Sequence, residues 1–76
     1  MIIDENTKGV EKIGHYFKFT GDLISDFLDI RIRLFVTGSI EADKWIKAGE
    51  GIKAGKWIEA GKWIKAGEGI EAGEGI

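Results

Sequence analysis

The 76-residue chain has no cysteine, no proline and a single histidine, and it contains no long apolar run. Without cysteine it has no disulfide framework and no thiolate zinc site. The lack of a run of roughly 18–20 apolar residues excludes a membrane-spanning helix. Eleven Lys and Arg against 13 Asp and Glu give a net charge of −2, which excludes a strongly basic nucleic-acid binder. We expect one small cytoplasmic domain that does not associate with membranes.

Glycine, in contrast, is abundant, and its placement divides the chain. Nine of the 12 glycines and all three tryptophans lie between residues 38 and 76, whereas all four phenylalanines lie in the first 37 residues. The second half is a six-residue repeat. Isoleucine recurs at positions 40, 46, 52, 58, 64, 70 and 76, and alanine follows each of the first six by two positions. Glycine follows each alanine except the first, which precedes Asp43.

This six-residue step fits an extended chain and not a helix. Six residues advance about 240° net around an α-helix, so the isoleucines would form no apolar stripe. In an extended chain each isoleucine and its alanine point to the same side. An antiparallel meander with two-residue turns would set Ile46 against Lys53, whereas parallel stacking sets isoleucine over isoleucine. The repeat therefore predicts a parallel β-solenoid.

Internal matches indicate how many sides each coil has. Residues 41–52 match residues 59–70 at 11 of 12 positions, an offset of 18, whereas residues 44–55 match residues 56–67 at nine of 12, an offset of 12. The longer offset favours three sides, with two as the alternative. We predict an all-β fold, a small three-sided parallel β-solenoid of about 18 residues per coil over residues 28–76. Residues 1–27 form an N-terminal cap.

The repeat phase also continues upstream of the glycine-rich half. Stepping back by six residues puts Leu34 and Leu28 in the isoleucine column, and Val36, Ile30 and Ile24 in the alanine column. We therefore expect the solenoid to begin near residues 22–28. Residues 13–23 alternate weakly and are interpreted as a strand pair that caps the first coil.

The hexads of residues 28–76 resemble those of left-handed parallel β-helix proteins of the hexapeptide-repeat type. That family places its small residue two positions before the aliphatic one, whereas here alanine comes two positions after and Lys or Glu takes the family's small position. The I-K-A-G and I-E-A-G runs also resemble repeats in bacterial and prophage proteins. The resemblance implies a parallel β-helix, and it raises the question of acyltransferase activity, which in that family uses a histidine at a subunit interface.

The residues themselves do not favour catalysis. His15 lies outside the repeats and has no evident partner to position it as a general base. Asp22, Asp26 and Asp29 form an acidic cluster without the ligand spacing of a calcium loop, and we interpret them as a solvated edge. The glycine-rich half lacks the spacing of a phosphate-binding loop. We expect no enzyme activity, no catalytic residue, no metal and no cofactor.

Tryptophans on the outside of the coil indicate a binding surface. Each precedes an inward isoleucine and so points outward. Trp45 and Trp63, 18 residues apart, stack on one face, and Trp57 falls on another. Tryptophan is enriched at interface hot spots, although such rings can also simply shield neighbouring backbone. Charges of one sign are segregated by face, as in surfaces that dock on a complementary partner. The candidate partner-binding residues are Trp45, Trp57, Trp63, Lys47, Lys65, Glu50 and Glu68.

We expect a protein partner, because interleaved acids argue against nucleic acid. Small repeat proteins without catalytic residues resemble phage-encoded inhibitors of host defence, anti-CRISPR proteins among them, so the most concrete partner is a host nucleic-acid-handling complex. The last coil leaves backbone and apolar side chains uncovered. We therefore also expect a homo-oligomer, most simply a twofold end-on dimer, with Ile70 and Ile76 at the contact. The alternative function is a structural element that polymerises end to end.

Overall fold

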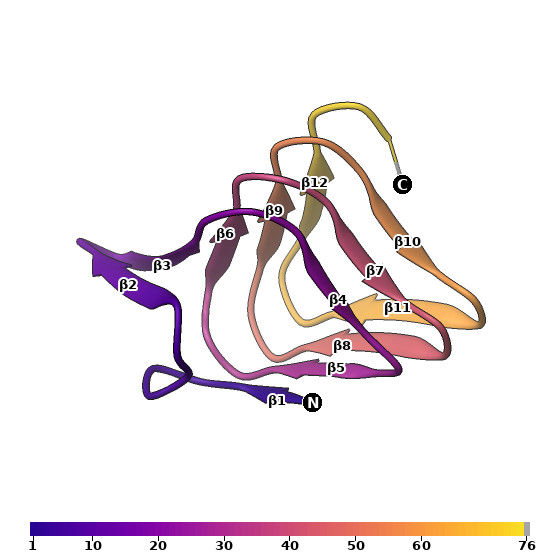
Figure 1. The fold of residues 1–76 in the computed structure, drawn as a ribbon, viewed down its shortest axis with the longest axis horizontal. Coiled ribbons are helices and arrows are strands. Elements are labelled where there is room, and N and C mark those ends of the chain that lie inside the picture. Colours follow the sequence, from indigo (N-terminus) through magenta and orange to yellow (C-terminus); the bar gives the residue numbers. More distant parts are fainter. Residues whose placement is uncertain (76) are drawn as a thin grey trace.

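The protein is a triangular parallel β-solenoid, as the computed structural model of the chain shows (Figure 1). The structure describes residues 1–75. Each side of the triangle is one sheet, which we name after a residue type on its outer surface. The tryptophan face contains β1 (Ile2–Ile3), β5 (Leu28–Ile30), β8 (Trp45–Ala48) and β11 (Trp63–Ala66). The glutamate face contains β4 (Leu23–Ser25), β7 (Ile40–Ala42) and β10 (Ile58–Ala60). The glycine face contains β2 (Val10–Ile13), β3 (Tyr16–Phe19), β6 (Leu34–Val36), β9 (Ile52–Ala54) and β12 (Ile70–Ala72).

Successive coils lie in register at the offset of 18 expected from the internal repeats. Ile46 pairs with Ile64, Ile40 with Ile58 and Ile52 with Ile70, all in parallel strands. The three-sided coil is therefore confirmed. Three coils, made by β4–β6, β7–β9 and β10–β12, are stacked along the molecule (Figure 1).

The core is a set of apolar columns that run through the middle of the triangle. Because strand residues alternate in direction, each three-residue strand points its first and last side chains inward. The isoleucine column of the tryptophan face, Leu28 and Ile46, is fully buried, and Ile64 in the last coil is partly buried. The second inward position is Ser25, Ile30 or Val36 in the first coil and alanine later. Two of the three sides of the first coil therefore place bulky side chains there, and the last coil places only small ones.

The first coil is shorter than the others, and this shifts its register. Phe17 pairs with Leu34 and Leu23 with Ile40, an offset of 17, whereas Leu28 pairs with Ile46 at the usual 18. The side that leads from Leu23 to Leu28 thus has five residues instead of six. As a result Leu23 takes the inward position, and the sequence-based placement of Ile24 in the core is wrong, since Ile24 is 64% exposed.

The N-terminal end of the solenoid is covered by the chain's own first strands. Strand β1 pairs in parallel with β5 and buries Ile3 completely. Strands β2 and β3 form an antiparallel hairpin whose second strand pairs in parallel with β6. Apart from the separate strand β1, continuous parallel stacking therefore begins at β3, further toward the N-terminus than residues 22–28. The hairpin projects sideways from the triangle (Figure 1).

The opposite end of the solenoid is open over residues 1–75. Strands β11 and β12 each have only one neighbouring strand there, the one in the preceding coil. Strand β10 is partly covered, because Trp57 bridges to Gly75 and Ile58 donates its N–H to the Gly75 carbonyl at 3.0 Å. The inward residues Ile64 and Ile70 in this coil are only partly buried. Across residues 1–75 the structure has no helix of the length and apolarity needed to cross a membrane.

Candidate functional site

A ladder of three aromatic rings runs along the tryptophan face, one ring per coil. Trp45 and Trp63 stack with ring centroids 5.3 Å apart and planes inclined by 6°. Phe27 continues the ladder below Trp45 at 4.9 Å with a tilt of 35°. Each ring comes immediately before an inward residue of its strand, so the pleat directs it outward. Trp63 remains 46% exposed, because no ring covers it on the open end within residues 1–75.

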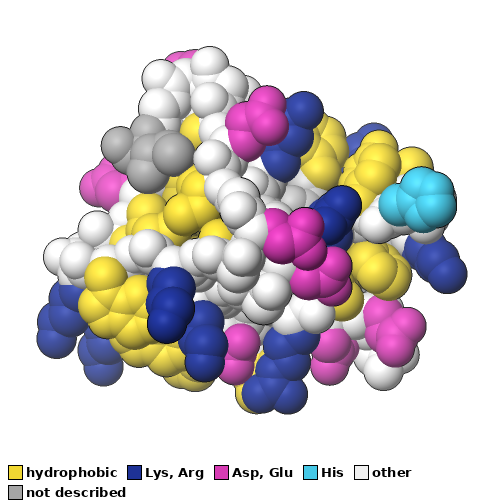
Figure 2. All heavy atoms as spheres, turned by 180° about the vertical axis from the view of Figure 1, so that it is seen from behind, with side chains coloured by type: hydrophobic (Ala, Val, Ile, Leu, Met, Phe, Trp, Pro, Cys, Tyr) yellow, Lys and Arg dark blue, Asp and Glu magenta, His cyan; other side chains and the backbone are white. Residues whose placement is uncertain are grey.

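Lysines flank the two tryptophans on both sides. Lys47 and Lys65 pair in register on one side, and Lys44 and Lys62 are joined by a backbone hydrogen bond of 2.7 Å on the other. All four side chains are exposed, and none forms an ion pair within residues 1–75. Figure 2 shows hydrophobic side chains with Lys and Arg gathered around them at one corner of the molecule. The tryptophan face therefore combines apolar ring surface with four uncompensated positive charges.

The charge changes sign where the ladder reaches the first coil. Asp26 lies below Lys44, since Lys44 donates its N–H to the Asp26 carbonyl at 2.8 Å, and Asp29 pairs in register with Lys47. Asp29 is held by Arg31 at 3.3 Å. The positive part of the face is thus confined to the second and third coils, around the two tryptophans.

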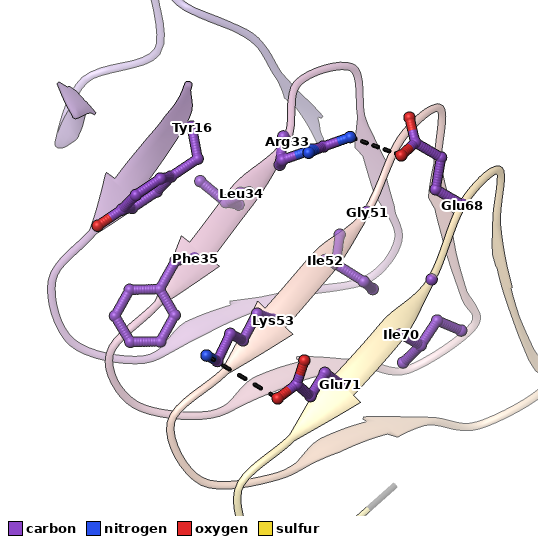
Figure 3. A pocket seen from close by; sticks show the side chains of 11 residues that line it. Tyr16, Arg33, Leu34, Phe35, Gly51, Ile52, Lys53, Glu68, Ile70 and Glu71 are labelled. Atoms are coloured by element: carbon purple, nitrogen blue, oxygen red, sulfur yellow. Dashed lines mark hydrogen bonds and ion pairs between the residues drawn. The ribbon is translucent and has the colours of Figure 1, made fainter. Parts of the chain in front are cut away.

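At the repeat position where the tryptophan face carries its rings, the glycine face carries only glycine in its last two coils, and its surface is hollowed there. Gly51 and Gly69 occupy the position that precedes the inward isoleucine, and they leave a shallow groove of about 630 Å³ between Tyr16, Phe35 and the surrounding charges (Figure 3). Arg33 crosses one side of this groove and forms ion pairs with Glu68 and, at 3.9 Å, with Glu50. These charges are therefore paired within the chain.

A second set of contacts closes the other side of the groove. Lys53 lies 3.9 Å from the Glu71 carboxylate and 5.7 Å from the centre of the Phe35 ring (Figure 3). These pairs are exposed, and each is worth little energetically. They nevertheless leave the glycine face with few free charges to offer a partner.

The glutamate face carries the third tryptophan. Trp57 is 39% exposed and lies beside the Glu41 and Glu59 column, which is in register at the offset of 18. The outward Ile24 precedes Glu41 in the same column. Trp57 is therefore separated from the stacked pair and has the exposed Lys56 on one side and the Glu41–Glu59 column on the other.

The structure brings together only some of the residues singled out in the sequence. Trp45, Trp63, Lys47 and Lys65 share the tryptophan face. Glu50 and Glu68 lie together at the edge of the glycine face around Arg33, and Trp57 lies on the glutamate face. Ile70 belongs to the open last coil, whereas Ile76 lies outside the described residues.

Three residues that complete these surfaces were not predicted. Phe27 joins the ring ladder, Arg33 bridges two glutamates and Phe35 lies beneath Lys53. Each could have been found by subtracting 18 from a known repeat position, because they stand one coil below Trp45, Gly51 and Lys53. They were overlooked because the first coil lacks the repeat's residue types.

The residues considered for catalysis or metal binding have structural or solvent-facing positions. His15 is exposed in the two-residue turn between β2 and β3, next to Gly14 with a positive φ of 58°. The Asp22 carboxylate accepts the Ser39 N–H at 2.8 Å and so ties the first coil to the second. Within residues 1–75 no group of three or more His, Cys, Asp or Glu side chains converges on a metal-sized site.

Comparisons with known proteins give no relative from which a function could be transferred: no family model, no curated protein and no solved structure matches the chain.

Proposed function

We propose that this protein is a non-enzymatic interaction module and that it binds an acidic protein surface with the part of the tryptophan face formed by the second and third coils. The observation that carries this proposal is the stacked pair Trp45–Trp63 framed by four lysines without ion-pair partners in residues 1–75. Aromatic rings supply apolar area that is favourable to bury, and free positive charges around them favour an anionic partner.

The competing faces are less suited to this role. On the glycine face, Arg33 and Lys53 are already paired with glutamates, so a charged partner would have to displace those contacts. On the glutamate face a single tryptophan lies between Lys56 and the Glu41–Glu59 column, so the charges around it are of mixed sign. The tryptophan face alone combines two adjacent rings with uncompensated charges of one sign.

The ring geometry favours a protein partner over a single-stranded nucleic acid. Bases bind by stacking on open ring faces, but Trp45 is sandwiched between Phe27 and Trp63. Mainly ring edges and the outer face of Trp63 are available. Asp26 and Asp29 on the same face would also repel phosphates.

The rigidity of the scaffold supports a role in occupying a partner's surface. Backbone ladders between coils fix the backbone positions of the lysines and the stacked rings at successive strand spacings, so little backbone ordering accompanies binding. We extend the proposal to its most concrete form, a small inhibitor that blocks a host nucleic-acid-handling complex.

We further infer that the architecture belongs with the hexapeptide-repeat β-helices. The six-residue side and the 18-residue coil support this inference.

End-to-end polymerisation is the rival function. A filament needs two complementary open ends, but β1 and the β2–β3 hairpin cover much of the N-terminal end. That cover favours a discrete binding module.

The test is a quantitative pull-down from the native cell with immobilised protein. Relative to the unmodified chain, we expect W45A/W63A to weaken capture of the principal partner by roughly thirty-fold or more, the effect of losing about 2 kcal/mol at a hot spot. The matched control is W57A, which removes the same side chain from another face and should leave capture within about twofold. Circular dichroism checks that both variants keep the strand signal. Equal capture by W45A/W63A and the unmodified chain would contradict the proposal, and loss with W57A alone would move the site to the glutamate face.

A further inference from the structure

The open rim of the last coil is the edge formed by β11 and β12, and its shape allows it to pair with the same rim of a second copy. Strands β11 and β12 present unpaired edges within residues 1–75 (Figure 1), and exposed edges of this kind pair readily with another strand. Residues 62–74 run around this rim through the corner at Glu68. The order of their side chains decides what the edge fits.

When two copies of residues 62–74 are placed antiparallel with Glu68 opposite Glu68, the pairs on either side of this centre are complementary. The opposed pairs are Lys62 with Glu74, Trp63 with Gly73, Ile64 with Ala72, Lys65 with Glu71 and Ala66 with Ile70. Inward residues meet inward residues, and both lysines meet glutamates. Cross-strand pairs of opposite charge stabilise an antiparallel ladder, and directly opposed like charges destabilise it.

We propose that two copies of this chain associate end to end through a twofold axis at the Glu68 corner, so that β11 of each copy pairs antiparallel with β12 of the other. The coil edge is a ramp, because the chain climbs one strand spacing per turn. A twofold rotation about an axis through the corner reverses both the direction along the rim and the height, so the two ramps match. Twofold contacts of this kind are self-complementary and closed.

The residue at the axis does not oppose this pairing. Glu68 of one copy would meet Glu68 of the other, but each carboxylate is already paired with Arg33 of its own chain. Trp63, whose outer ring face is open, would be covered by the second copy at Gly73, where no side chain obstructs it.

Charge excludes the neighbouring registers. Moving the axis by three residues keeps inward side chains together, but in one direction it sets Lys65 against Lys65. In the other direction it sets Glu71 against Glu71 and also Glu68 against Glu74, so that register has more like-charge contacts than the register about Glu68. Only the register about Glu68 makes both flanking pairs attractive. This contact uses the rim edges of Lys62, Trp63 and Lys65, which also belong to the proposed partner site, and its tests read out self-association alone.

Cysteine cross-linking tests this register directly, because the chain has no cysteine of its own. A mixture of K65C and E71C should form an intermolecular disulfide under mild oxidation, because directly opposed antiparallel residues lie within disulfide reach. K65C alone should cross-link poorly, since its symmetry mate lies six positions away along the rim. The matched control is K47C mixed with E71C, in which the cysteine occupies the same column one coil away from the rim. Equal cross-linking of the two mixtures would overturn the proposal.

Charge exchange tests it in solution by sedimentation equilibrium. The unmodified chain should sediment at twice its 8.4 kDa mass, with dissociation on dilution. K65E should weaken the dimer by about tenfold or more, because both symmetric pairs become repulsive. K65E/E71K should restore it, and K47E should leave it unchanged. A monomer at all concentrations, continued growth beyond a dimer, or failure of the double variant to recover would each overturn the proposal.

Discussion

At the scale of single residues, four of the five glycines that follow an alanine are required by a close approach of two coils. Gly61 does not have a positive φ, so its role is not conformational freedom. Its N–H donates to the Ala42 carbonyl at 3.0 Å, and a Cβ built on it would overlap the carbonyl oxygen of Asp43. Gly55, Gly67 and Gly73 meet a carbonyl of the coil below in the same way. The corner has room for a hydrogen atom but not for a methyl group.

The exception at Asp43 has the same physical cause. Asp43 and Lys44 donate to the carbonyls of Ser25 and Asp26, two consecutive residues, whereas Gly61 and Lys62 donate to Ala42 and Lys44 and skip a residue. The short first coil thus lacks the corner residue whose carbonyl would stand beneath Asp43. A side chain is accommodated there because the coil below is one residue shorter.

A pair of alanine substitutions tests this account. G61A should lower the free energy of unfolding by about 1–3 kcal/mol, as overpacking does, because the Asp43 carbonyl must move. G49A is the matched control, since it occupies the same repeat position and nothing lies within 4 Å of its built Cβ. It should be neutral or stabilising by up to about 1 kcal/mol, because it restricts only the unfolded chain. Urea unfolding of both variants measures the difference, and equal destabilisation would contradict the account.

At the scale of strands, burial decreases toward the open end in the isoleucine columns of the tryptophan and glycine faces, whereas Ile58 on the glutamate face stays fully buried. Ile46 in β8 is fully buried between Leu28 and Ile64, whereas Ile64 in β11 is only partly buried. I46A should therefore cost about 2–5 kcal/mol, the range for removing a packed aliphatic side chain. I64A should cost less than about half of that in dilute solution, because less surface leaves contact. Chemical denaturation at low protein concentration measures both, and an equal cost would show that the last coil is as well covered as the second.

The repeats predicted the strands of the last two coils, the three sides and the inward columns, because a period of six in an extended chain determines which side each residue faces. The start of the stack was not predictable in this way. Leu23 and Ile24 are both aliphatic, so composition alone could not show which one faces inward after the loss of one residue at the corner. The ring stack of Trp45 and Trp63 followed from their spacing, whereas the Arg33 contact depends on a long side chain reaching across coils.

At the scale of the whole molecule, the three faces built from one repeat differ mainly through three of its six positions. The position before isoleucine is tryptophan or glycine, and the position after isoleucine and the position two residues before it are each lysine or glutamate. These choices leave the core columns unchanged. The scaffold can therefore carry a basic aromatic face, a hollow face and an acidic face without a change in its packing.

The most direct test of the proposed binding face is a nuclear magnetic resonance titration of the ¹⁵N-labelled protein with the partner purified by pull-down. The three tryptophans give three indole N–H signals, which single Trp→Phe variants assign, and Trp57 serves as a control within the same sample. We predict that the signals of Trp45 and Trp63 shift or broaden as the partner is added and that the signal of Trp57 does not move. A shift of the Trp57 signal alone, or no change in the Trp45 and Trp63 signals at saturation, would contradict the account.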